Sequence, residues 1–572
     1  MVLVLFRRLW LLAVVGLISC SKPQPVDLVI HNGTIYSVDS QNPVVEAVGV
    51  IDDRIVYVGG FENLKARIAT STQVLDLQGQ TLTPGWIEGH GHFMGMGYNK
   101  LELDLREVTS YQQLVDAVAD AVEQSEPGEW ILGRGWHQSK WIVQPDTLVK
   151  GFQTHNQLSA VSPDNPVYLR HASGHAGFAN AKAMEIAGVK NIQLEEMPVE
   201  LGEGGEIIRD PFGNPTGIFN ERAMTLITTH IPETTSEKDQ QALILAVEEC
   251  LRHGITSFHD AGVDQKTIDL YKSAIDREQL KVRLWVMLSG RDSTLLQNWY
   301  GTGPEIGYGN HHLTVRSIKM YMDGALGSRG AWLLEDYSDR PGHRGHETTP
   351  IETLFQLSND ALEHGFQVCS HAIGDRANQE VLDQYQLAFE ANPQAAQDSR
   401  FRIEHAQHIN LQDIPRFAEM GVIAAMQGIH MSSDRPWAID RLGLERIEEG
   451  AYVWQKLLKS GAVVVNGSDV PVEPLDPLAS FYASVTRKTL KGTPEGGYEA
   501  DQSMTREQAL RSYTLDAAFS AFEEDLKGSI EVGKLADFAV FSKDIMKVPE
   551  QELLNTKVTY TIVGGVVHPQ NP

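Results

Sequence analysis

Four places far apart in the chain carry side chains that could bind a metal ion, and each follows a short β-type run. His90 and His92 follow residues 82–89, His371 follows 366–370, His405 follows 401–404, and Asp469 follows 463–468. In a parallel β/α barrel the carboxyl ends of the strands meet at one face, so residues distant in sequence can share one site. Four imidazoles and a carboxylate are a plausible ligand set for Zn²⁺ or a similar divalent ion.

The pair His90 and His92 has the spacing that places both rings on one side of an extended segment, because strand side chains alternate. We expect Gly91 between them to let the backbone pass close to a metal. Taken alone, such a pair is a weak motif, and most pairs of this kind are not ligands.

The middle of the chain alternates short β-type runs with longer helical patterns, which favours an α/β fold and a closed (β/α)8 barrel. Candidate strands begin near Thr83, Ile255, Val282, Val315, Phe366, Phe401, Val422 and Val463. Residues 130–133 and 167–169 also resemble strands, and we assign them to an insertion of about residues 98–250 after the first barrel strand. The candidate ligands then fall at the ends of strands 1, 5, 6 and 8, and Lys319 ends strand 4.

Both ends of the chain have strand and turn signals outside the barrel pattern. We expect residues 27–83 and 526–570 to pair into a small β-sandwich domain, with the barrel in residues 84–525. In the insertion, Trp136, Trp141, Phe178 and Phe212 either form its own core or line a substrate pocket under a lid. The first alternative is the commoner one for such residues.

The composition is that of a globular protein, with 42% hydrophobic and 22% charged residues. The net charge of −27 argues against a nucleic-acid partner, because phosphate binding needs clustered Lys and Arg. The acidity indicates no more than solubility.

The first 20 residues have the pattern of an export signal, with Arg7 and Arg8 before a short apolar run. The run ends at Cys20, and LISC at residues 17–20 resembles the bacterial lipobox. The resemblance implies a lipidated Cys20 and an anchor in the bacterial cell envelope, at the outer membrane facing the periplasm because Ser21 follows. The alternative is an ordinary secretory signal with an incidental cysteine.

Several motifs together resemble the amidohydrolase superfamily, in its branch of YtcJ-like and N-substituted formamide deformylase enzymes (amidohydrolase family 3). They are TPGWIEGHGH at 83–92, KMYMDGALGSR at 319–329, SHAIGDRA at 370–377, RIEHAQ at 402–407, GSDVPV at 467–472 and GSIEVGKLADF at 528–538. They occur in the family's order, and the resemblance extends over about residues 27–570.

The resemblance implies a site with one or two divalent ions, most simply Zn²⁺, and six residues that hold them. These are His90, His92, Lys319, His371, His405 and Asp469. An ammonium cannot bind a cation, so Lys319 would be carboxylated on its side-chain nitrogen; alternatively it pairs with Asp323 or another acid. Asp469 would also be the catalytic residue that moves a proton from water to the leaving nitrogen. Read without its context, Asp469 would be a helix N-cap.

Five further residues are candidates for substrate contacts: His175, His259, Asp323, Arg329 and Arg376. His175 could equally be a loop histidine, and the branch commonly has Asp-Gly-His where this chain has Ser173-Gly174-His175. His259 could instead support a metal ligand. Asp323, Arg329 and Arg376 could equally be solvated charges.

The sequence therefore predicts a metal-dependent amidohydrolase that cleaves a carbon–nitrogen bond of a small molecule. A lactone or ester hydrolase with the same metal site and a non-catalytic metal-binding lipoprotein are the alternatives. A complete ligand set beside Asp469 argues against the non-catalytic lipoprotein, because a binding protein needs no proton carrier. A homodimer is possible.

Overall fold

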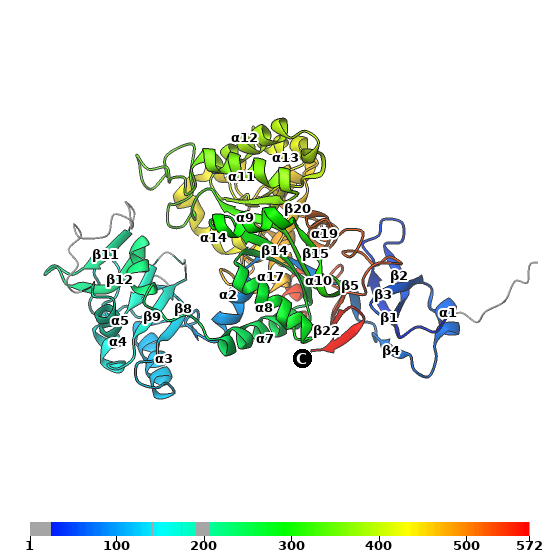
Figure 1. Cartoon of the computed structure of the whole chain (residues 1–572), viewed down its shortest axis with the longest axis horizontal. Helices are drawn as coiled ribbons and strands as arrows, with labels where there is room; N and C mark the ends of the chain where they lie inside the picture. Colours follow the sequence, from blue (N-terminus) through cyan, green and yellow to red (C-terminus); the bar gives the residue numbers. More distant parts are fainter. Residues whose placement is uncertain (1–23, 139–140, 173, 175, 190–204, 571–572) are drawn as a thin grey trace, which may run out of the picture.

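The computed structural model describes residues 24–138, 141–172, 174, 176–189 and 205–570. The predicted signal segment with Cys20, and His175, lie outside the described residues. The described strands form three sheets, one in a central barrel and one in each of two flanking units (Figure 1). Within the described residues, no helix has the length and apolar character needed to cross a membrane.

Eight parallel strands form the central barrel, as predicted. In spatial order they are β6 (Trp86–Gly91), β13 (Ile255–Val263), β14 (Arg283–Ser289), β16 (Leu313–Tyr321), β17 (Gln367–Ala372), β18 (Arg402–His405), β19 (Ile423–Met426) and β20 (Val464–Asn466). The first and last strands meet where the N–H of Asp469 donates to His90 O at 2.8 Å and that of His92 donates to Val470 O at 2.7 Å. The site residues of the two chain regions are therefore brought together by closure of the barrel.

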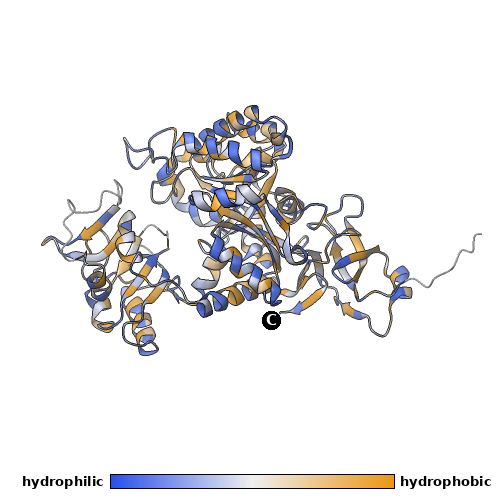
Figure 2. Cartoon of the chain, viewed as in Figure 1, coloured by the Kyte–Doolittle hydropathy of each residue, from blue (hydrophilic) through white to orange (hydrophobic). Residues whose placement is uncertain are grey.

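Helices cover the outside of the barrel and bury its apolar residues. They include α7 (Ser236–Arg252), α8 (Gln265–Asp276), α9 (Ser293–Thr302), α11 (Ile351–His364), α12 (Asp375–Ala391), α13 (Ile414–Met420), α14 (Gly428–Leu442), α16 (Trp454–Ser460) and α17 (Pro477–Thr486). The strands are buried, as expected for parallel strands covered on both faces; β14 and β19 are mainly apolar, whereas β6, β17 and β18 also carry buried polar residues (Figure 2).

The two chain ends share one flanking sheet. Its strands are β1 (Leu28–Tyr36), β2 (Val44–Ile51), β3 (Arg54–Gly59), β4 (Gln73–Asp76), β5 (Thr81–Pro84), β21 (Phe538–Phe541), β22 (Val558–Val563) and β23 (Val566–Pro569). All eight are hydrogen-bonded into a single sheet, in which β1 pairs with β4 along its first half and with β5 along its second, and they enclose one apolar core. Thr83 was expected to begin the first barrel strand, but β5 pairs with β21 and the barrel strand begins at Trp86.

The insertion forms the third sheet and has its own core. Its strands are β7 (Leu103–Asp104), β8 (Ile131–Trp136), β9 (Val167–His171), β10 (Ala176–Ala179), β11 (Gly205–Arg209) and β12 (Pro215–Glu221), with α3 (Tyr111–Glu123), α4 (Asn156–Val161) and α5 (Ala181–Ile186). Trp136, Trp141 and Phe178 are buried there, whereas Phe212 is 89% exposed. The predicted range of 98–250 is too long, because α7 packs on α2 (Phe93–Asn99) and leads into β13.

Candidate metal centre

The predicted histidines and Asp469 meet at the carboxyl ends of the barrel strands. Asp469 Oδ1 lies 3.3 Å from His92 Nε2 and 3.7 Å from His90 Nε2. These three residues offer ligand atoms that all lie within 4.8 Å of one another. The ring centroid of His405 is 5.1 Å from that of His90 and 4.5 Å from that of His371, so one continuous cluster results.

Lys319 belongs to the same cluster. Its Nζ lies 3.0 Å from His90 Nε2, and the side chain is buried. Burial lowers the pKa of this amine, although Glu404 and Asp469 act in the opposite direction. Asp323 was the predicted alternative partner, but its carboxylate accepts the N–H groups of Ile373 and Gly374. In the part of the chain that the structure describes, no carboxylate forms an ion pair with Lys319.

Each imidazole has one ring nitrogen within 3.4 Å of a protein oxygen, and Nε2 of His90 and of His92 also approach Lys319 and Asp469. The contacts are His90 Nδ1 with Glu404 Oε2 at 2.5 Å, His92 Nδ1 with Ala261 O at 3.0 Å, His405 Nδ1 with Gln427 Oε1 at 2.8 Å, and His371 Nε2 with Asp323 Oδ1 at 3.4 Å. Metal-binding histidines in proteins have such partners, which fix the tautomer and the ring orientation.

Two of the imidazoles, those of His90 and His405, are held in the neutral form that binds metals. Burial, with the help of Lys319, lowers the pKa of His90 to about 4, and burial with His371 lowers that of His405 well below its ordinary value. Both rings are therefore neutral at neutral pH, with a lone pair to donate. Nitrogen donors with an adjacent carboxylate fit one or two divalent ions of the Zn²⁺ type.

Asp469 is placed by backbone contacts rather than by a helix. It has φ 58° and lies after β20, and the N–H of the preceding Ser468 donates to Glu88 Oε1 at 2.6 Å. Asp476, not Asp469, is the N-cap of the next helix, α17. Burial alone would raise the pKa of Asp469, but the bond from His92 and its electrostatic interaction with the histidine cluster bring it well below its ordinary value. The carboxylate is thus ionised, as a proton acceptor must be.

Gly91 is required for a different reason from the one we expected. A Cβ at this position would lie 2.6 Å from the ring of Phe258, so the close approach is to a barrel side chain.

The structure gives the other predicted site residues different contacts. His259 is buried and faces Arg402, with Nδ1 3.0 Å from the guanidinium Nη1. Arg329 pairs with Asp339 at 2.7 Å, and Arg376 pairs with Glu380. Asp323 orients His371 and a loop. These contacts orient the four side chains, and their roles as substrate contacts stay predictions; His259 Nε2 has no hydrogen-bond partner among the described residues.

Glu404 and Gln427 contact the ligands but were not predicted. Alternation along a strand would place Glu404 and His405 on opposite sides. His405 and Ala406, however, have φ of 74° and 40°, and this turn of the backbone lets Glu404 and His405 both reach His90. A glutamate directly before a candidate ligand at a strand end was the only available signal.

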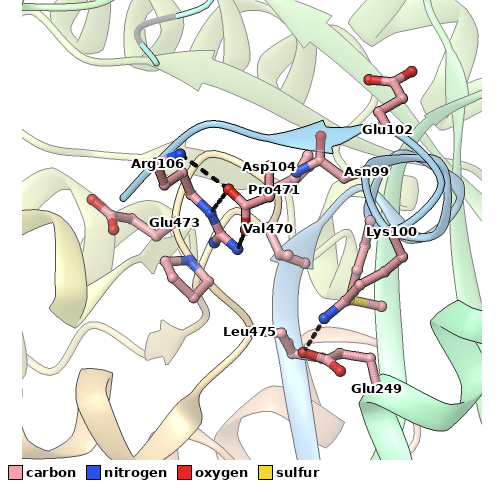
Figure 3. Close-up of a pocket in the computed structure, with 12 residues that line it drawn as sticks. Asn99, Lys100, Glu102, Asp104, Arg106, Glu249, Val470, Pro471, Glu473 and Leu475 are labelled. Atoms are coloured by element: carbon pink, nitrogen blue, oxygen red, sulfur yellow. Dashed lines mark hydrogen bonds and ion pairs between the residues drawn. The ribbon is translucent and has the colours of Figure 1, made fainter. Parts of the chain in front are cut away.

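A cavity of about 180 Å³ adjoins the loop that follows Asp469 (Figure 3). One wall is Val470 to Leu475, and the other comes from α2, α7 and the start of the insertion, including Lys100, Asp104 and Arg106. Charged side chains dominate it, and most pair with one another, as Arg106 does with Asp104. The insertion thus contacts the site region through a polar junction.

Comparisons with known proteins agree with this geometry. Residues 73–568 match the amidohydrolase family. Protein LONG AFTER FAR-RED 3 of Arabidopsis thaliana is 33% identical over 94% of this chain and 91% of its own. Putative amidohydrolase YtcJ of Bacillus subtilis is 30% identical (94% and 98%), and N-substituted formamide deformylase of Arthrobacter pascens is 27% identical (95% and 98%).

A solved structure with the same fold is an uncharacterized metal-dependent hydrolase from Pyrococcus horikoshii. It has a TM-score of 0.73 and 26% identity, over 91% of this chain and 99% of that one. The superfamily and branch indicated by the motifs are confirmed by these matches.

Proposed function

Since the chain belongs to the amidohydrolase family, and is a hydrolase with the donor set of a metal centre, we propose that it cleaves a carbon–nitrogen bond in a small amide or formamide. One observation carries the proposal. Four imidazoles, each with one ring nitrogen beside a protein oxygen, form one cluster with Lys319 and the ionised Asp469.

The residues that would hold the metal are His90, His92, Lys319, His371 and His405, with Asp469 beside them. A divalent ion, most simply one or two Zn²⁺, supplies Lewis acidity that activates water near neutral pH and polarises a carbonyl. Lys319 would contribute an oxygen donor after its neutral amine adds CO₂, which forms an N–C bond and releases one proton. The missing ion pair on Lys319 supports this modification.

Asp469 is the proton carrier in the proposed reaction. Its Oδ1 accepts a proton as the water oxygen adds to the amide carbon, and it returns that proton to the nitrogen as the C–N bond breaks. The products are a carboxylic acid and an amine. His92, 3.3 Å from Oδ1, and the backbone contact of Asp469 with His90 hold the carboxylate in position.

The test is metal analysis followed by a panel of formamides, acetamides, dipeptides, esters and lactones. Hydrolysis of formamides or acetamides in the metal-loaded protein supports the proposal. Cleavage of esters or lactones alone would support the alternative that the protein is an ester or lactone hydrolase. A metal-loaded protein that cleaves nothing in the panel would support the alternative that it only binds a metal. Two measurements test the ligand set. One is the Zn²⁺ content, and the other is mass spectrometry of the peptide that contains Lys319, after chemical trapping of its carbamate so that CO₂ is not lost.

We also propose that the protein is exported and anchored through a lipidated Cys20, on the basis of LISC at residues 17–20. Mass spectrometry of the mature N-terminus tests this. A Cys20→Ala variant should leave the membrane fraction, whereas an unlipidated N-terminus would contradict the proposal.

A further inference from the structure

Arg291 stands at the carboxyl end of β14 and stacks on Tyr321, with the guanidinium carbon 4.3 Å from the ring centroid. The preceding Gly290 donates its N–H to Lys319 O at 3.0 Å. A Cβ on Gly290 would lie only 2.6 Å from that oxygen, so this close crossing requires glycine. The backbone before Arg291 is therefore fixed against the strand that carries Lys319.

Tyr321 connects Arg291 to the metal centre. It follows Lys319 by two residues, and its ring centroid is 5.2 Å from Lys319 Nζ and 6.0 Å from the ring of His371. On another side, its hydroxyl approaches Gly262, next to Ala261, the residue that holds His92. Tyr321 therefore lies beside the candidate metal centre. Arg291 is exposed and lies over the ring of Tyr321, so it stands at the solvent side of that centre.

Arg291 has no acidic partner. It is exposed, and among the residues that the structure describes none forms an ion pair or a side-chain hydrogen bond with its guanidinium. Arg376 offers a contrast, because it also lies over an aromatic ring, that of Trp332 at 5.5 Å, but pairs with Glu380. Stacking holds the Arg291 plane in one orientation and leaves its N–H groups free to donate. In a chain of net charge −27, an exposed arginine that forms no ion pair among the described residues and stands beside the candidate metal centre indicates a negatively charged ligand.

We propose that Arg291, held on Tyr321, binds a carboxylate of the substrate, so that the preferred substrates are small amides that carry an acidic group. This inference rests on the proposed function for the bond that is cleaved. A guanidinium donates two parallel N–H bonds to a carboxylate, and stacking on Tyr321 leaves that edge available. Arg291 is then a specificity residue, and the metal centre performs the chemistry.

The experiment compares N-formyl-leucine with N-formyl-leucinol, in which a hydroxymethyl group replaces the carboxylate. The wild-type protein should prefer the acid. Arg291→Gln should lower kcat/KM for the acid about 10- to 100-fold, mainly through KM, and leave the alcohol within about twofold. Arg291→Lys should recover part of the loss. Arg316→Gln, which removes an arginine that lies over Phe522, is the matched control, and it should change neither substrate.

Equal use of both compounds by the wild type, or an equal loss on both in Arg291→Gln, would overturn the inference. Calorimetry of N-formyl-leucine binding to the zinc-loaded protein tests the role of Arg291 separately from the proposed reaction. Binding that depends on Arg291 without amide cleavage would refute the reaction and keep the inference. Cleavage that does not depend on Arg291 would refute the inference and keep the reaction.

Discussion

Glu404 Oε2 lies 2.5 Å from His90 Nδ1, and the same carboxylate accepts two bonds from the guanidinium of Arg402. All three side chains are buried. Glu404 thus fixes the tautomer and rotation of His90, and leaves Nε2 to face Lys319 and Asp469. A candidate metal ligand of the first strand is thus oriented by an acid of the sixth.

Replacing Glu404 by Gln should lower the affinity for Zn²⁺ about 10- to 100-fold, because His90 loses its charged partner. Competition with a chromophoric chelator measures the affinity, and circular dichroism identifies the folded fraction, since Arg402 also loses its partner. Glu524→Gln removes the acid that pairs with Arg400 at 2.8 Å far from the site and should bind zinc normally. A folded Glu404→Gln protein with unchanged affinity would contradict this role.

Asp469→Asn should reduce kcat about 10²- to 10⁴-fold, because an amide cannot accept the proton that the reaction moves. Metal content should change little, since the imidazoles and Lys319 remain. Steady-state kinetics and metal analysis of the same preparation test both statements. Asp476→Asn, which alters the N-cap of α17, should keep its turnover. Retained activity in Asp469→Asn would remove this residue from the mechanism.

The sequence predicts the barrel because short β-type runs, of which β14 and β19 are mainly apolar, alternate with longer helical patterns. His371, His405 and Asp469 could be placed at one face for that reason alone. Glu404 could not be assigned, because its direction depends on the left-handed backbone at His405, which no side-chain pattern records. The same limit applies to Gly91, whose neighbour Phe258 comes from a different strand.

Two phenylalanines of the insertion should respond very differently to truncation. Phe178 is fully buried in the insertion's core, whereas Phe212 is 89% exposed in the turn between β11 and β12. Phe178→Ala should lower the free energy of unfolding of the insertion by about 3–5 kcal/mol, and Phe212→Ala should change it by less than about 0.5 kcal/mol. Urea unfolding and limited proteolysis measure the difference. Equal effects would contradict the packing described for this unit.

The ion pair between Arg283 of β14 and Asp537 joins the barrel to the sheet made by the chain ends. Arg283 Nε lies 2.7 Å from Asp537 Oδ2, Nη2 lies 3.0 Å from Oδ1, and both side chains are buried. Burial alone would raise the pKa of Asp537, but Arg283 and the N–H of Gly564 bring it below its ordinary value.

Asp537→Asn should therefore lower the free energy of unfolding by about 3–5 kcal/mol at pH 7, since it leaves a buried guanidinium without its counter-charge. Because the folded-state pKa is the lower one, the carboxylate stabilises the fold above its unfolded pKa of about 4, and this contribution is lost as the pH falls through the folded value. The difference between wild type and variant should shrink below about pH 4 in urea titrations at a series of pH values. Glu62→Gln, which removes an exposed partner of Lys65, should stay within about 1 kcal/mol throughout. A difference that is equally large at both ends of the pH series would mean that Asp537 acts through its shape and hydrogen bonds, and not through its charge.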